Sequence, residues 1–262
     1  MVRTYERRLV LAVHAHGYDK RTALMQRLTG ESLGTAFDAA AGRAGLGTDQ
    51  WHRTREGHRL LAVLPVGAPE PLVTDHFVQQ VHIAIREHNR LVATEGRLRL
   101  RLAIHFGMVG GNAESGFDGP APVEAHEMAG CRGALEVLDR SEADLVVVVS
   151  KPIFEDTIAG QLTSLETRDL RKLHVHGRDA WLWAPGCALP DQTTGEHDAH
   201  ADEDGAASSD GGVGDEKQGM AGAAPKTDTP RRPSVSTFTK ARINMRGGQI
   251  AGGDIHNHGG DR

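Results

Sequence analysis

The chain has 262 residues, enough for one domain of ordinary size with an extension or for two small domains. Its formal net charge is −5 at pH 7, so the composition gives no support for general nucleic-acid binding. No apolar run approaches the roughly 20 residues that a membrane-spanning helix needs, and the run behind the basic N-terminus, Leu9–Val13, is too short for a signal peptide. Cys131 and Cys187 stand far apart, in no metal-ligand spacing. We therefore expect a cytoplasmic protein with reduced thiols, without nucleic-acid partners and without a membrane-spanning segment.

Residues 1–186 have the pattern of one packed domain. Continuous apolar runs at Leu9–Val13 and Leu145–Val149 indicate strands buried on both faces. Alternating arginine and leucine over Leu98–His105 predicts a strand with one solvent-exposed face, which stops at a His-x-Gly turn and continues as a hairpin. The remaining expected elements are strand pairs at 51–55 with 58–64 and 173–175 with 180–183, and helices at 21–44, 73–89, 123–138 and 152–158. This mixture predicts an α/β (α+β) fold, with a mixed sheet and flanking helices.

The composition changes after residue 185. Between Cys187 and Pro230 the large apolar side chains are Leu189, Val213 and Met220, while small, polar and acidic residues predominate. Such a segment buries too little apolar surface to offset the entropy of ordering it. We therefore expect residues 187–233 to form a disordered, mostly acidic linker.

Apolar side chains return in residues 234–262, between pairs of glycines and next to asparagine and glutamine. Strand fragments this short do not make a monomeric domain, but identical segments can stack on one another with side-chain ladders of Asn and Gln. The residues that form this pattern are Ile243, Met245, Gly248, Gln249, Ile250, Gly253, Ile255 and His256. Two other interpretations remain open: a disordered glycine-rich tail, or a weak metal-binding tail at His256 and His258.

The segment from Arg242 to His258 resembles bacterial amyloid signalling motifs, which are short C-terminal segments joined by a flexible linker to an effector domain. The resemblance implies homotypic assembly templated by a matching motif on a nucleotide-binding oligomerisation-type (NLR-like) receptor, in a setting such as antiphage defence. A long linker would let the folded domain hang from a growing fibril. Assembly would then cluster the N-terminal domains.

Residues 7 to 184 resemble the class III nucleotidyl cyclases, closest to the divergent cyclase-homology domains of actinobacterial proteins, which have a ferredoxin-like core. Gly17-Tyr18 match the pair that follows the family's first metal-binding Asp, but His14 stands at the Asp position itself. His58 stands where the hairpin carries the second metal-binding Asp. On the family's helix, Val123 replaces the ribose-binding Asn and Glu127 replaces the Arg that stabilises the transition-state phosphates.

These departures predict a pseudoenzyme with no catalytic residues and no cofactor. Magnesium prefers carboxylate and water ligands, and a Glu at the position of the phosphate-binding Arg reverses the required charge. Imidazole suits zinc or another transition metal better. His14, His16 and His58 could therefore form such a metal site, but ordinary histidines at strand ends are the favoured interpretation, because no further Cys or paired carboxylate stands at ligand spacing.

Two functions of different classes follow. The first is a catalytically silent signalling protein, clustered through its tail and assembled with copies of itself. The second is an active or nucleotide-sensing cyclase-like enzyme, which would use a divalent metal and a nucleoside triphosphate and would carry an incidental tail. Cyclase-type sites form between two domains, so the resemblance implies a homodimer under both.

Overall fold

A computed structural model describes residues 5–112 and 116–189. Its strands form one mixed sheet in the order β2-β3-β1-β4-β6-β8-β7, and β5 pairs with the end of β4. They are β1 (Tyr5–Ala15), β2 (His52–Glu56), β3 (Arg59–Val63), β4 (Leu100–Asn112), β5 (Gly116–Asp118), β6 (Leu145–Ser150), β7 (Arg171–Val175) and β8 (Arg178–Trp183). The pairing of β4 with β6 is parallel, and every other pairing in the described sheet is antiparallel. β2 and β7 are the two edges of this order.

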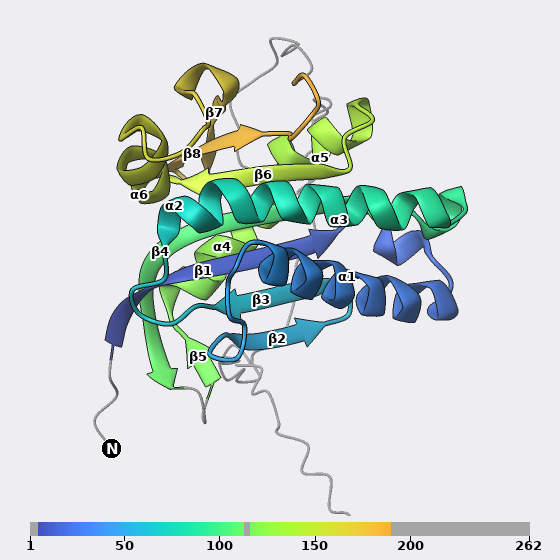
Figure 1. Ribbon diagram of the computed structural model, residues 1–262, viewed down its shortest axis with the longest axis horizontal. Helices are drawn as coiled ribbons and strands as arrows, with labels where there is room; N and C mark the ends of the chain where they lie inside the picture. Colours follow the sequence, from blue (N-terminus) through green and yellow to red (C-terminus); the bar gives the residue numbers. More distant parts are fainter. Residues whose placement is uncertain (1–4, 113–115, 190–262) are drawn as a thin grey trace, which may run out of the picture. The chain divides into compact units, whose positions relative to one another are not determined.

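Helices cover both faces of the sheet (Figure 1). They are α1 (Ala23–Arg43), α2 (Glu70–Leu72), α3 (Val78–Leu91), α4 (Pro120–Gly130), α5 (Arg132–Arg140) and α6 (Lys151–Ile153), with the 3-10 turns η1 (Tyr18–Lys20), η3 (Thr94–Gly96) and η5 (Thr167–Asp169) and the π-helical segments η2 (Val73–Phe77) and η4 (Phe154–Ala159). α1 and α3 lie on one face, and α4 and α5 lie on the other (Figure 1).

The central strand β1 shows why the sheet is buried on both sides. Leu9, Leu11 and Val13 enter the core beneath α1 and α3, whereas Val10 and Ala12 enter the core beneath α4 and α5. Successive side chains of a strand point to opposite faces, so a continuous apolar run fits a strand covered twice. The predicted mixed α/β fold and the strands at Leu9–Val13 and Leu145–Val149 are confirmed.

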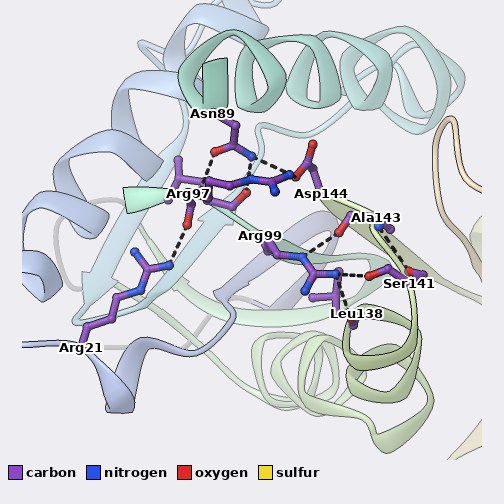
Figure 2. A network of polar contacts seen from close by, with 9 residues as sticks. Arg21, Asn89, Arg97, Arg99, Leu138, Ser141, Ala143 and Asp144 are labelled. Atoms are coloured by element: carbon purple, nitrogen blue, oxygen red, sulfur yellow. Dashed lines mark hydrogen bonds and ion pairs between the residues drawn. The ribbon is translucent and has the colours of Figure 1, made fainter. Parts of the chain in front are cut away.

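The arginine-leucine strand differs from its prediction in two respects. Its expected solvent-exposed face is buried, since Arg101 is only 7% exposed and Arg99 is partly buried. Figure 2 shows the reason for Arg99: its guanidinium donates hydrogen bonds to the carbonyl oxygens of Leu138, Ser141 and Ala143, around the end of α5. The strand also continues past the His-x-Gly segment to Asn112 before it pairs with β5, so the predicted stop there is wrong.

The start of β4 is fixed by a second group of polar contacts (Figure 2). The Asn89 amide on α3 receives a hydrogen bond from the Leu98 backbone and donates to the Leu98 carbonyl oxygen and to Asp144. Arg97 pairs with the same Asp144 carboxylate at 3.0 Å. These bonds tie α3 and the segment before β6 to the residues that lead into β4, the strand that carries Arg101.

Other predicted elements are confirmed with changes at their ends. The strand pairs are β2 with β3 and β7 with β8. The helix expected over 123–138 is two helices, α4 and α5, because Cys131 takes an extended conformation between them. The helix expected over 73–89 begins as the π-helical η2 and continues as α3.

The last described strand ends at Trp183, and the predicted linker at 187–233 and the motif at 234–262 lie, except for residues 187–189, outside the described residues. They stay predictions, as does the boundary at residue 186. No helix in the described ranges combines the length and apolar character needed to cross a membrane.

Candidate functional site

The two histidines that the resemblance aligned with metal-binding positions lie next to each other. His14 is near the end of β1, and His58 is in the turn that joins β2 to β3. A hydrogen bond from the Ala15 backbone to the His58 carbonyl oxygen, at 2.9 Å, joins the two segments. Their ring centroids are 5.9 Å apart, and the Tyr18 ring lies 4.9 Å from that of His58. The structure thus brings together the two positions that the resemblance selected.

A third imidazole completes this cluster, and the sequence reasoning missed it. His126 on α4 lies with its Nδ1 atom 3.0 Å from His14 Nε2, and the two rings stack with centroids 5.3 Å apart. His126 stands between the two α4 positions that the resemblance had selected, Val123 and Glu127. Residues three apart share a helix face, so its spacing from Val123 was a signal that could have been used. We call His14, His58 and His126 the histidine cluster.

His16 is not part of this cluster. Its Nε2 atom lies 3.2 Å from a carboxylate oxygen of Asp139 on α5. In residues 5–112 and 116–189, no group of three or more His, Cys, Asp or Glu side chains is arranged to hold a metal ion. The geometry therefore argues against the site predicted for His14, His16 and His58.

Burial disfavours the protonated form of each imidazole in the histidine cluster. The His14 side chain is 4% exposed, and its desolvation, followed by the charge of Arg101, lowers its pKa to about 3. Desolvation also lowers the pKa of His58 and of His126, and the nearby Arg59 guanidinium adds to both effects. A neutral imidazole can accept one hydrogen bond and donate one, which suits the contact between His14 and His126.

The two selected positions on α4 carry no cation. Val123 is 57% exposed, and the Glu127 carboxylate lies 3.6 Å from the Arg178 guanidinium. Arg178 also pairs at 3.3 Å with Glu124, whose other carboxylate oxygen lies 3.2 Å from His105 Nε2. These paired side chains border a cavity of about 600 Å³ between the middle of β4, α4 and the β7–β8 turn. Its α4 wall therefore presents carboxylates already paired with Arg178.

A larger cavity, of about 840 Å³, lies between α3 and the segment that follows β8. None of the site residues selected from the sequence lines it. The site residues selected from the sequence therefore lie on the other face of the sheet, which α4 covers.

No family model matches the sequence, and no curated protein matches it. Among solved structures, the fold is similar to that of the guanylyl cyclase Cya2, with a TM-score of 0.50 and 13% identity over 70% of this chain and 93% of that chain. Two others are the monomeric double mutant of the guanylyl cyclase domain of the RhoGC fusion protein from the fungus Blastocladiella emersonii (TM-score 0.48, 13% identity, 70% and 97% covered) and the adenylate/guanylate cyclase/hydrolase from Silicibacter pomeroyi (0.47, 17%, 70% and 99%). The likeness to Cya2 establishes the nucleotidyl cyclase core fold for this domain.

Proposed function

We propose that this domain is a catalytically inactive homologue of the nucleotidyl cyclases that acts in signalling. One observation carries the proposal: His14 and His58, which the resemblance aligns with the family's metal-binding aspartates, lie together, and His14 is buried against His126. The site's own side chains thus contact one another where the family holds metal ions.

The residues present do not fit a magnesium site. Two-metal catalysis at a triphosphate needs hard oxygen ligands. The histidine cluster offers ring nitrogens, and one pair of them is already engaged at 3.0 Å. On α4, Glu127 would repel the phosphates that the family's Arg attracts. The positions that the resemblance selects for metal binding and for charge stabilisation therefore carry residues unsuited to either role.

An assay for cyclic nucleotides tests the inactivity. The full chain is expected to form no cyclic AMP or cyclic GMP from ATP or GTP above the buffer background, with either Mg²⁺ or Mn²⁺, because neither ion finds carboxylate ligands at His14 and His58. Product formation that is abolished by His14→Ala and His58→Ala, and kept by His174→Ala on the exposed edge strand β7, would overturn the proposal.

We further propose that the domain is clustered by its tail. Residues 234–262 would act as the homotypic assembly motif and residues 187–233 as the tether, with a homodimer of the folded domain, and an NLR-like receptor carrying a matching motif would start assembly in the cytoplasm. The glycine-punctuated pattern around Gln249 and Ile250 supports this, and antiphage defence is the setting we infer.

Assembly is measured on the full chain by thioflavin fluorescence and sedimentation. The full chain is expected to form fibrils, whereas Ile250→Pro should stay unassembled because proline cannot donate a ladder hydrogen bond. Ala221→Pro, in the linker, is the matched control and should assemble as the parent does. Equal assembly of both variants, or none by the parent chain, would remove the tail from the proposal.

The second candidate is a domain that senses a nucleotide without turning it over. The cavity of about 600 Å³ beside α4 favours it, because this volume accommodates a metabolite-sized ligand. Its test is equilibrium binding of ATP and GTP to the full chain, with Glu127→Gln as the variant at the cavity wall.

A further inference from the structure

The cavity of about 840 Å³ borders the core beneath α1 and α3, and no residue of the histidine cluster lines it. Helix α3 and the π-helical η2 before it form one wall, and the segment around η5 forms a second. Residues 185–189, which follow β8 (orange in Figure 1), form the third, and we call them the strap. Ligand sites in proteins commonly have volumes of roughly 300 to 1,000 Å³, so this cavity can hold a small molecule.

Two rows of helical side chains line the first wall. Within each row the residues are four apart, and side chains at that spacing lie on one face of a helix. The rows are Thr74, Val78 and His82, and Asp75, Gln79 and Ile83. From Thr74 to His82 the helix rises by roughly 12 Å. The wall is therefore long and narrow, which suits an elongated ligand.

The middle of the cavity is apolar. Val78, Leu170 and Trp183 line it and belong to the core beneath α1 and α3. Ile83, on the same helix as Val78, is 42% exposed although it is a large apolar side chain. A ligand with an apolar body would remove the surface of Ile83 from water, which is favourable.

The charges in the cavity wall already have partners. They belong to two carboxylates and two guanidinium groups, those of Asp75, Asp169, Arg168 and Arg171. All four are engaged with other groups of the chain. Asp75 accepts a hydrogen bond from the Ser164 backbone at 2.6 Å, and Arg168 pairs with Glu166 at 2.8 Å. A charged ligand would have to displace one of these partners, whereas an uncharged ligand would not.

The two ends of one helical row offer hydrogen-bonding groups. The Thr74 hydroxyl is buried and has no hydrogen-bond partner among the described residues, and a buried hydroxyl without a partner costs free energy. At the other end, desolvation lowers the pKa of His82, and the charge of Arg86 adds to this effect. The neutral His82 ring can donate one hydrogen bond and accept another.

The strap closes the cavity next to His82. A Cβ atom at Gly186 would lie 3.0 Å from the Cε1 atom of His82, and the φ of Gly186 is +69°. Glycine, which has no Cβ atom and tolerates a positive φ, therefore lets the strap approach the imidazole directly. The Cys187 backbone donates a hydrogen bond to the Ala184 carbonyl oxygen at 3.1 Å, which holds the strap in a turn.

We propose that this cavity binds an elongated, uncharged small molecule with an apolar body, and that His82 forms a hydrogen bond with a polar group of that molecule. The apolar middle accommodates the body, and the paired charges of the wall select against an ionised ligand. The site lies apart from the histidine cluster, so a bound molecule would reach the domain without contacting the residues that the family resemblance selected.

The test uses prodan, an uncharged naphthalene dye with one carbonyl group, whose emission depends on the polarity and hydrogen bonding of its surroundings. Titration of the full chain is expected to show saturable binding, with emission at shorter wavelength than in buffer. Ile83→Glu, which places a charge in the wall, should weaken binding about tenfold. Leu91→Glu is the matched control, because Leu91 is also exposed on α3 but does not line the cavity, and it should bind as the parent does.

A second pair of variants tests His82. His82→Phe keeps an aromatic ring but removes both ring nitrogens, so the bound dye should lose a hydrogen bond to its carbonyl group and emit at still shorter wavelength. Affinity should fall about fivefold. His76→Phe, at an exposed position of η2 outside the cavity wall, should change neither quantity. Unchanged emission and affinity in His82→Phe would remove His82 from the site.

An anionic dye tests the charge preference. Anilinonaphthalene sulfonate should bind about tenfold more weakly than prodan, because both guanidinium groups of the wall already have partners. No binding of prodan, equal effects of Ile83→Glu and Leu91→Glu, or an affinity for the sulfonate equal to or above that for prodan would overturn the inference. The proposed inactivity and tail assembly do not depend on this result, because cyclic-nucleotide formation and fibril formation decide them.

Discussion

At about pH 4 the folded domain is expected to be less stable than at neutral pH by on the order of 5 kcal/mol. Burial lowers the pKa of His14 to about 3 and that of His105 to about 4. In the unfolded chain both groups titrate near the ordinary value of about 6.5. As the pH falls below that value, both histidines become protonated in the unfolded chain. In the folded domain they stay unprotonated until the pH approaches their lowered pKa values. Their contribution to stability is thus complete above about pH 6.5 and is lost as the pH falls toward the folded pKa values.

A loss of this size is comparable with the whole stability of an ordinary domain, so acid should unfold it. Urea unfolding of the full chain at a series of pH values measures the effect. His14→Gln combined with His105→Gln should flatten the acid limb, whereas His174→Gln, at a side chain that is 70% exposed, should leave it unchanged. An acid limb of the same slope in the His14/His105 variant would show that other groups cause it.

Replacement of a buried charge should make the domain more stable. We expect Arg101→Met to raise the free energy of unfolding by about 3 kcal/mol, because methionine fills similar space without the desolvation penalty of a guanidinium whose Nε atom has no partner among the described residues. Denaturant unfolding of the full chain and of the variant measures the effect.

Arg99→Met is the matched control for Arg101→Met. Arg99 directly precedes β4, and Arg101 is the second residue of that strand. The two side chains are two residues apart and therefore lie on one face, but Arg99 donates to three carbonyl oxygens around the end of α5. Its loss leaves those acceptors without partners and should destabilise the domain by about 2 kcal/mol. Destabilisation by both changes would show that Arg101 is retained for packing. Opposite signs would show that the buried guanidinium of Arg101 lowers the stability of the fold.

The sheet could be predicted from local patterns because each strand is specified locally. The apolar runs at Leu9–Val13 and Leu145–Val149 fit strands covered on both faces, as observed. The alternation at Leu98–His105 was misinterpreted for a physical reason. Arginine on a strand usually marks solvent, but Arg99 finds its partners in the last turn of α5, which lies far along the chain. That contact cannot be predicted from the residues next to Arg99 in the sequence.

The site was partly predictable. The family resemblance selected His14 and His58 correctly as neighbours in space. It grouped His16 with them, although that side chain turns to Asp139, and it passed over His126, which belongs to a helix that packs on the strand only in the folded domain. The alignment of Arg59, His14 and Arg101 across three strands could not be predicted, because these residues become neighbours only through strand register.

The two edge strands of the sheet carry several basic side chains, and these affect whether copies of the domain can join edge to edge. β2 carries His52, Arg53 and Arg55, and β7 carries Arg171, Lys172 and His174. Basic side chains on outer strands oppose the approach of another copy's outer strand, which would carry charge of the same sign. In the assembly that we propose for the tail, neighbouring folded domains should therefore stay separate along the filament and should not join edge to edge into one continuous sheet.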